Sequence, residues 1–570
     1  MASLYKKVIG GRPYWYLREM GWVDGKPKMV SERYLGTAAE VEALLDARER
    51  AMVPERTRHL DFGAVAAAWG LLADLGVAGI IDEACGGRPP GLPLSPGTYL
   101  MLAALNRVVD PCSERGFADW WRTTAADRFA KIPAPALDHR RFWDAMHAVP
   151  LDALPRIEEK LALAACARSG LDTSSVALDM TNFATFTGTG NGRAPIAQRG
   201  KARQKRADLR LVGLGLVVTR DGGVPLLSHA YPGSKPDVTQ FPQMIQTLAG
   251  RHAALAAAAG QGGTEMTVVF DAGQNSEANF ALLAGTGLRY VGSVPASDCR
   301  DLLALPADAR TVVDKDRFGG LTACDTRREV YGTGRRAILT RSPELHAHQA
   351  RGFDGTTLAK ATRQLDELAA TLARGKTRRA RDKVEAEITK ITRDPWVRRV
   401  ITWQLAGGKP RDLRLTWSID AAARAALEEE IFGKHVLITD HDDWPAAEVI
   451  AACRSQSEAE FSFRQMKDPR AVSFSPMSRW TEHNIRIHVF TCVLALQTAH
   501  LMRLQAERAG LRMSVRELLH QLAGIGETVL IYPAGRGRPK ARRMLTETTP
   551  AQDKLIETFR LDRYAPAVRS

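Results

Sequence analysis

The chain has 570 residues, of which 45% are hydrophobic and 25% charged, so it is long enough for several globular modules. Its net charge of +15 and pI of about 9.6 favour a polyanionic partner, nucleic acid before membrane. The seven cysteines are scattered singly, which argues against a zinc ribbon or a disulfide framework and indicates a reducing compartment. We expect no membrane partner, because the longest apolar stretch, residues 489–502, is too short to span a bilayer.

The N-terminal third contains two different patterns. Residues 1–40 alternate aromatic and polar residues around glycine turns, which predicts a small antiparallel meander. Residues 41–170 are alanine-rich and helical in pattern. This helical region could bind DNA ends or serve as a plain scaffold, and no helix-turn-helix signature decides between the two.

The next stretch predicts an alternation of strands and helices. Strands are predicted at 174–186, 209–219, 224–231, 266–270 and 288–294, and helices at 236–252 and 275–285. Three antiparallel strands followed by helix, strand, helix and strand is the order of an RNase-H-like core. We therefore predict an α/β protein with an RNase-H-like, retroviral-integrase-like catalytic core, whose first part covers residues 171–296.

Two acids occupy matching places in this predicted sheet. Asp179 falls within the first strand, and Asp271 ends the fourth, directly before an Ala-Gly turn. Both strands are central in such a sheet, so the two carboxylates can lie side by side. Taken alone, Asp271 is equally well explained as the cap of the following helix.

A third acid lies in the segment RSQSEAEFSFRQMKD. Helical spacing puts Glu460, Arg464 and Lys467 on one side, with Gln456 one turn earlier, whereas Glu458 points away as a surface residue. A carboxylate in this position can hold a metal ion while the cations bind phosphate oxygens. The same spacing also occurs in solvated helices stabilised by ion pairs.

About 130 residues intervene between the fifth strand and the short strand 434–440 that leads into this helix. They contain a charged helical segment at 358–391 and probable strands at 398–405 and 413–419. We therefore predict an inserted module of mixed β/α structure at 297–432, the rest of the core with strand 434–440 at 433–505, and a basic C-terminal region at 506–570.

Four motifs carry a family resemblance: LDMTNF, VVFDAGQNSEANF, GKHVLITDHDDW followed by RSQSEAEFSFRQMKD, and FSPMSRWTEHNIRIHVFTCVLAL. With them the chain resembles the DDE transposases of bacterial insertion sequences, in the IS-four-like superfamily whose RNase-H-like core is interrupted by an insert. The resemblance covers most of the chain. It implies that Asp179, Asp271 and Glu460 are the catalytic, metal-binding acids.

The signature of that superfamily places Tyr, Arg, Glu and Lys at fixed steps. Glu460 and Lys467 match it, whereas Cys453 and Gln456 stand where the Tyr and the Arg would be. The resemblance thus implies DNA contacts from Lys467 and from the position of Gln456. Arg454 or Arg464 could replace the missing arginine as a phosphate contact.

The implied activity is cleavage at transposon ends followed by transfer of the freed 3′-hydroxyl into target DNA. Two Mg²⁺ ions, with Mn²⁺ able to substitute, would serve this phosphoryl transfer. The implied partners are the terminal inverted repeats and the target DNA, with a homodimer in the synaptic complex. The implied location is the bacterial cytoplasm, in association with the nucleoid.

Relatives with this insert can form a DNA hairpin on the element end. Trp403 and Trp417 in the insert could stack on the unpaired bases of such an intermediate, or they could simply be core residues. Two alternatives to a transposase stay open: an RNase-H-like nuclease that does not join strands, and a catalytically inactive DNA-binding descendant.

Two basic runs predict further DNA contacts. Four cations lie in the loop between the first two strands of the core: Lys201, Arg203, Lys205 and Arg206. They would bind backbone phosphates without reading sequence, or else belong to a merely solvated loop. In the C-terminal region, Arg536 and Arg538 belong to an RGRP sequence that resembles the core of an AT-hook, which enters a minor groove. A nonspecific basic tail is the alternative.

Overall fold

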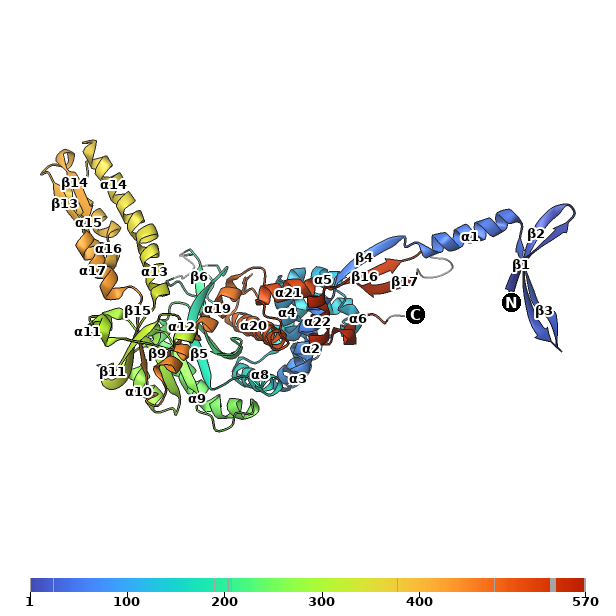
Figure 1. Cartoon of the computed structure of the whole chain (residues 1–570), viewed down its shortest axis with the longest axis horizontal. Coiled ribbons are helices and arrows are strands. Elements are labelled where there is room, and N and C mark those ends of the chain that lie inside the picture. Colours follow the sequence, from blue (N-terminus) through green and yellow to red (C-terminus); the bar gives the residue numbers. More distant parts are fainter. Residues whose placement is uncertain are drawn as a thin grey trace. The chain divides into compact units, whose positions relative to one another are not determined.

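The computed structural model describes residues 2–23, 25–188, 190–201, 206, 208–376, 378–475, 477–533 and 540–567. Four of the predicted DNA contacts lie outside these ranges: Arg203, Lys205, Arg536 and Arg538. The chain forms two compact units (Figure 1). Unit 1 comprises residues 1–72, 112–141 and 505–570, and unit 2 comprises residues 73–111 and 142–504.

Unit 1 begins with a three-stranded antiparallel sheet formed by β1 (Ala2–Ile9), β2 (Arg12–Val23) and β3 (Lys26–Gly36). Gly10 and Gly11, both with positive φ, make the turn between β1 and β2, where a residue with a Cβ would be strained. Helix α1 (Ala38–Met52) follows. The alternating pattern of residues 1–40 thus corresponds to a meander.

A second sheet of unit 1 joins the two ends of the chain. Its strands are β4 (Arg56–Asp61), β16 (Gly526–Ile531) and β17 (Ala541–Leu545), with β16 in the middle. These three strands are not among the predicted elements: β4 lies within the region 41–170 expected to be helical, and β16 and β17 lie within the C-terminal basic region 506–570. The helices of the unit are α2 (Gly63–Asp74), α5 (Glu114–Thr123), α6 (Asp127–Ala130), α21 (Val515–Ala523) and α22 (Pro550–Phe559).

Unit 2 is built on a nine-stranded mixed sheet in the order β10-β11-β12-β15-β9-β8-β5-β6-β7. Five of these strands come from the region with predicted alternation: β5 (Ser175–Thr185), β6 (Arg210–Thr219), β7 (Pro225–Pro232), β8 (Thr267–Phe270) and β9 (Arg289–Val294). The first three pair antiparallel, β8 pairs parallel with β5, and β9 pairs parallel with β8. The predicted order of elements in this region is confirmed.

The other four strands extend the sheet beyond β9. They are β10 (Thr311–Val312), β11 (Thr322–Val330), β12 (Thr333–Arg341) and β15 (Lys434–Thr439). The sequence analysis assigns residues 311–341 to the inserted module, whereas the structure pairs β12 with β15 in the main sheet. Residues 325–329 of β11 are five consecutive polar residues, DTRRE, and this conceals the strand in a reading of hydrophobic runs.

The remaining part of the insert forms a module with its own core. Its elements are α13 (Pro343–Gly352), a π-helical turn (Phe353–Leu358), α14 (Ala359–Ala373), α15 (Arg381–Ile391), α16 (Pro395–Val400), β13 (Ile401–Ala406), β14 (Arg414–Ile419) and α17 (Ala421–Ile431). Leu365, Leu368 and Ile388 are among the buried residues that join these elements.

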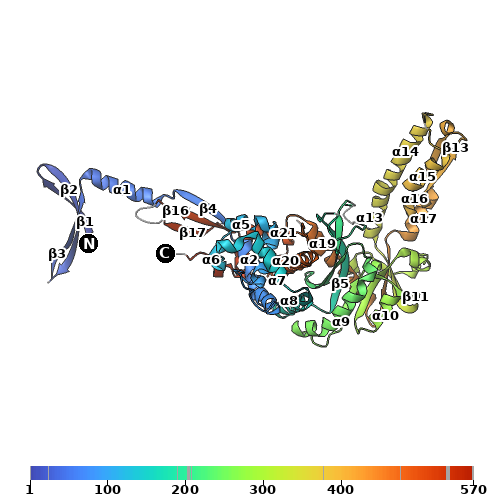
Figure 2. The ribbon, with the colours of Figure 1, turned by 180° about the vertical axis from the view of Figure 1, so that it is seen from behind.

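Unit 2 also contains a set of helices. They are α3 (Val77–Ala84), α4 (Pro96–Val109), α7 (His139–Ala148), α8 (Leu154–Ser169), α9 (Phe241–Ala258), α10 (Glu277–Ala284), α11 (Arg300–Leu303), α12 (Lys315–Phe318), α18 (Ala446–Arg454), α19 (Gln456–Lys467) and α20 (Glu482–Arg508). Helices α9 and α10 lie side by side (Figure 2). Gly215 of β6 lets α9 approach, because a Cβ there would meet Met244 at 2.3 Å.

Among the described residues, α20 is the single helix long and apolar enough to cross a membrane, and the bent pair α2 and α3 would add a second if counted as one span. In α20, 94% of the apolar window is buried inside the protein, as in the core helix of a folded domain. His488 and His500 of α20 are buried, and burial lowers the pKa of His488 well below its ordinary value and that of His500 to about 3. Both therefore act as neutral packing residues.

Candidate active site

Asp179 and Asp271 stand at the same edge of the sheet. The parallel pairing of β5 with β8 runs to Leu178 opposite Phe270, so the two aspartates occupy the next positions in register. Side chains in register on parallel strands face the same side, and neighbouring strands lie about 4.8 Å apart. Strand β8 ends at this point, whereas β5 continues beyond it. We call this region the carboxyl edge, because it lies at the carboxyl end of β8. The predicted adjacency of the two strands is confirmed.

Both aspartates are held by backbone N–H groups. Asp271 accepts hydrogen bonds at Oδ1 from the Ala272 N–H at 2.7 Å and from the Ser293 hydroxyl at 2.8 Å. Asp179 accepts at Oδ1 from the Met180 N–H at 2.7 Å. Asp271 therefore caps the turn that follows β8, as its position in the sequence allows, and the residue is exposed.

Helix α19 packs against the strand that carries Asp179. The Gln456 side-chain amide donates to the Leu178 carbonyl at 2.9 Å, and the Lys467 ammonium donates to the Thr181 hydroxyl at 2.9 Å. Glu460 lies one turn after Gln456 and two turns before Lys467 on the same stripe of the helix. Glu460 thus extends from the helix face turned toward β5, and it is exposed to solvent.

Glu458 is not the surface residue that the sequence analysis expects. Its carboxylate forms an ion pair with Arg503 of α20 at 3.2 Å, and the residue is half-buried. The helical spacing of α19 correctly places Glu458 and Glu460 on different faces of the helix. The face that carries Glu458, however, packs against another helix and is not open to solvent. Tertiary packing of α20 decides this, and it could not be read from local spacing.

Two further side chains lie close enough to Asp271 to feel its charge. Burial raises the pKa of Cys453 to about 12, and the Asp271 carboxylate adds to that rise. Burial lowers the pKa of His435, while Asp271 acts in the opposite direction. Cys453, which stands at the position of the signature tyrosine, is therefore a neutral thiol beside Asp271. Sequence reasoning misses His435 and Ser293; the place of Ser293 on the strand beside β8 is a signal that could have found it.

The remaining predicted DNA contacts have diverse environments. The Arg454 guanidinium lies 4.6 Å from the centre of the Phe318 ring, and Arg464 is exposed. Arg206 pairs with Asp208 at 2.7 Å. The Lys201 carbonyl accepts a hydrogen bond from Asn182, which alternation places on the face of β5 opposite Asp179. Of the predicted DNA contacts that the structure describes, Lys467 is therefore a cation held against the Asp179 face.

Trp403 and Trp417 face each other across β13 and β14. Both are half-buried and pack against the core of the inserted module. The Trp417 indole N–H donates to Asp366 of α14 at 3.2 Å. These contacts fit the core interpretation of the two tryptophans, because ring faces and the N–H are used within the module.

The carboxylates of the carboxyl edge are ligands of the kind that Mg²⁺ and Mn²⁺ prefer. Asp179 and Asp271 lie next to each other and could share an ion. Across the described ranges, however, no group of three His, Cys, Asp or Glu side chains is placed to hold a metal ion. Glu460 thus does not complete a three-ligand set with the two aspartates in this conformation.

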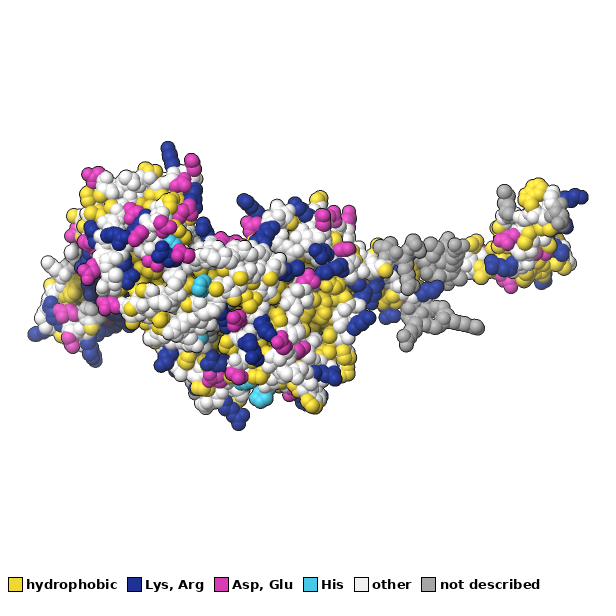
Figure 3. All heavy atoms as spheres, turned by 90° about the horizontal axis from the view of Figure 1, so that it is seen from below, with side chains coloured by type: hydrophobic (Ala, Val, Ile, Leu, Met, Phe, Trp, Pro, Cys, Tyr) yellow, Lys and Arg dark blue, Asp and Glu magenta, His cyan; other side chains and the backbone are white. Residues whose placement is uncertain are grey.

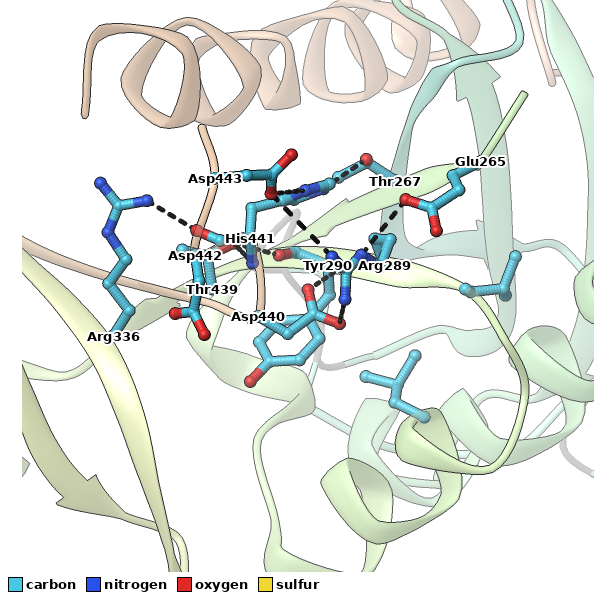
Figure 4. A network of polar contacts seen from close by, with 12 residues as sticks. Glu265, Thr267, Arg289, Tyr290, Arg336, Thr439, Asp440, His441, Asp442 and Asp443 are labelled. Atoms are coloured by element: carbon cyan, nitrogen blue, oxygen red, sulfur yellow. Dashed lines mark hydrogen bonds and ion pairs between the residues drawn. The ribbon is translucent and has the colours of Figure 1, made fainter. Parts of the chain in front are cut away.

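A polar network occupies the opposite edge of the same strands, where β8 and β9 begin and β15 ends (Figure 4). We call this the amino edge. His441 meets the Thr267 hydroxyl at 2.8 Å through Nε2, and Arg336 donates to the carbonyls of His441 and Trp444 at 2.6 and 2.7 Å. Asp440 accepts from the Tyr290 N–H at 2.9 Å. These contacts fix the connection from β15 into α18, which leads directly to α19 and Glu460.

No protein-family model matches the chain, and no curated protein matches it in sequence. Among solved structures it is similar to a piggyBac transposase synaptic complex with hairpin DNA, with a TM-score of 0.38 and 8% identity over 90% of this chain and 86% of that one. The function proposed below therefore rests on the residues of this chain.

Proposed function

We propose that this protein is a DDE-type transposase that cuts DNA at transposon ends and joins the 3′ ends to target DNA. The observation that carries the proposal is the register of β5 and β8, which sets Asp179 beside Asp271 at one edge, with α19, the helix that bears Glu460, packed against β5. The sheet order around them supports an RNase-H-like core. The proposed location is the bacterial cytoplasm, at the nucleoid.

Each residue has a distinct role in this proposal. Asp179, Asp271 and Glu460 would hold two Mg²⁺ ions, replaceable by Mn²⁺, which when bound supply charge stabilisation for in-line attack on a phosphodiester. Their convergence requires a movement of Glu460 toward the aspartates. Lys467, held by Thr181, would orient a phosphate near the scissile bond. Two element ends require two such sites, hence a homodimer during synapsis.

The decisive experiment compares two glutamates of one helix. Purified protein is incubated with duplex DNA from the boundaries of its own genetic element, Mg²⁺ and a supercoiled target plasmid. Glu460→Gln is expected to reduce cleavage and joining by about 100-fold or more, because a metal-binding charge is lost. Glu458→Gln is the matched control: it removes an ion pair with Arg503 on the opposite side and should leave both activities within about threefold.

Other outcomes redirect the proposal. Cleavage without joined products identifies a nuclease instead of a transposase. Loss of activity in Glu458→Gln alone places the chemistry elsewhere.

A second candidate is a catalytically inactive DNA-binding descendant of a transposase. The specific observations that favour it are the lack of a three-ligand group among the described residues and the neutral Cys453 at the signature position. This candidate predicts DNA binding by the wild type without any cleavage in Mg²⁺ or Mn²⁺. Cleavage by the wild type and not by Glu460→Gln would eliminate it.

A further inference from the structure

The sheet β17-β16-β4 of unit 1 concentrates positive charge on a narrow ribbon. Its two outer strands carry Arg56 and Arg58 on β4 and Arg542 and Arg543 on β17, with Lys540 directly before β17. All five side chains are exposed. Lys and Arg side chains gather over these strands on the face seen in Figure 3.

Register defines how the cations are distributed. Arg58 and Arg543 both pair with Val529 of the central strand, one from each side, so they share one face about 10 Å apart. Arg56, two residues before Arg58 in β4, lies on the same face. Arg542 lies on the other face, because it pairs with Leu530. The ribbon thus presents cations on both sides.

A buried acid neutralises part of the positive charge of the ribbon. Glu527 of β16 is fully buried and forms ion pairs with Arg128 at 2.5 Å and with Arg543 at 2.6 Å. Arg58 donates to the Arg122 carbonyl of α5. These contacts explain why Arg128 and Arg543 are present as structural residues. One carboxylate, however, balances only one of the charges.

The outer part of the ribbon keeps its charge. Within the described ranges, Arg56, Lys540 and Arg542 form no ion pair with an acid. The basic run of the inserted module is different, since Arg379 pairs with Glu387 and Arg381 with Glu385. A cluster of unbalanced cations on a thin ribbon is stable only if solvent or a polyanion screens it.

We propose that this ribbon is a binding surface for the phosphate backbone of duplex DNA. The partner follows from charge: the ribbon is an antiparallel three-stranded sheet whose outer strands both carry exposed cations, and phosphates spaced along a duplex offer a matching row of negative charges. Cations on both faces can then contact backbone phosphates without reading the base sequence. The choice of DNA rests on the proposed function, while the surface itself belongs to unit 1 and contains none of the proposed catalytic acids.

The test measures DNA binding without catalysis. Full-length protein in EDTA is titrated against a labelled 30-base-pair duplex of mixed sequence, by fluorescence anisotropy at several salt concentrations. The ribbon variant combines Arg56→Gln, Lys540→Gln and Arg542→Gln. We expect its affinity to fall at least about tenfold and the log–log salt slope to fall by about 2 to 3, since each lost phosphate contact removes about 0.9.

The control removes the same charge from the same unit. It combines Arg115→Gln, Arg512→Gln and Arg516→Gln, three exposed arginines outside the ribbon. The control should lose less than about threefold in affinity and keep its salt slope. Thermal melts of both variants should match the wild type, because the Glu527 ion pairs are untouched.

Several results would overturn the inference. Equal losses in both triple variants mean that overall charge, not the ribbon, governs binding. An unchanged ribbon variant places the DNA surface elsewhere, and preferential binding of the wild type to anionic phospholipid vesicles or duplex RNA identifies another partner. Failure of the proposed function is distinguishable, because a protein that never cleaves can still show the ribbon effect in EDTA, and one that cleaves can lack it.

Discussion

The two edges of the central strands use acids in opposite ways. At the amino edge three acids meet an arginine: Asp440 and Asp443 lie 3.7 and 4.0 Å from Arg289, and Asp442 lies 2.6 Å from Arg327. At the carboxyl edge Asp271 is held by a hydroxyl and a backbone N–H instead. Ion pairs at the amino edge build structure, whereas hydrogen bonds to Asp271 orient a carboxylate that can still accept a cation or a substrate.

The first test of this difference between the two edges removes one negative charge from each edge. Asp271→Asn should reduce DNA cleavage by about 100-fold or more, with little change in melting temperature because Asn can keep the capping oxygen. Asp440→Asn is the matched change at the amino edge and should leave cleavage within about threefold. Initial cleavage rates and thermal melts of both variants provide the measurement. Equal activity in the two variants would remove the distinction between the edges.

The second test removes the central cation of the amino edge. Arg336 is 11% exposed and binds two carbonyls and Asp325, so Arg336→Ala should lower the free energy of unfolding by about 2–4 kcal/mol. Arg327→Ala, which removes a 63% exposed ion pair, should cost less than about 1 kcal/mol. Urea denaturation measures both. Similar losses of unfolding free energy in the two variants would show that burial does not determine how much each arginine stabilises the fold.

The third prediction concerns pH. Burial lowers the pKa of His441, with Asp440 acting the other way, so the folded protein keeps this ring neutral while the unfolded chain protonates near its ordinary pKa of 6.5. The His441 contribution is therefore fully present above pH 6.5 and is lost as pH falls toward the lowered folded pKa, by less than about 1.4 kcal/mol per pH unit.

Urea midpoints between pH 7.5 and 5 check this contribution. His441→Gln should flatten the loss of stability relative to the wild type. His348→Gln changes an exposed ring, so its urea midpoints should follow the wild-type pH curve. His488 and His500 are unchanged, so they contribute the same pH dependence of stability to all three proteins. Parallel curves for wild type and His441→Gln would exclude His441 as a source of the pH dependence.

The smallest expected effect comes from Ser293, which donates a hydrogen bond to Asp271 at the carboxyl edge. Ser293→Ala removes the hydroxyl bound to Asp271 and should cost about 1 kcal/mol of stability and less than about tenfold in cleavage rate. Ser293→Thr keeps the hydroxyl and should restore most of the rate. Cleavage kinetics and urea denaturation on the two variants give the comparison. A loss as large as that of Asp271→Asn would make Ser293 part of the chemistry.

The sequence by itself determines the local order of the core and the position of its acids. Strand and helix periodicity between 174 and 294 predicts β5 to β9 and the intervening helices to within a few residues at most boundaries, because each element buries a face and is bounded by turn residues. Helical spacing likewise separates Glu460 from Glu458 on α19. Such features depend on neighbours in sequence.

Tertiary structure alone decides which side chains meet and which charges are balanced. The register of β5 on β8, the pairing of β12 with β15 and the pairing of β4 with β16 join segments far apart in the chain. Asp440 and Asp271 both follow apolar strands in sequence, and only the partner across the sheet edge, Arg289 or Ser293, distinguishes them. Long-range pairing is a property of the whole packed sheet, which local periodicity does not encode.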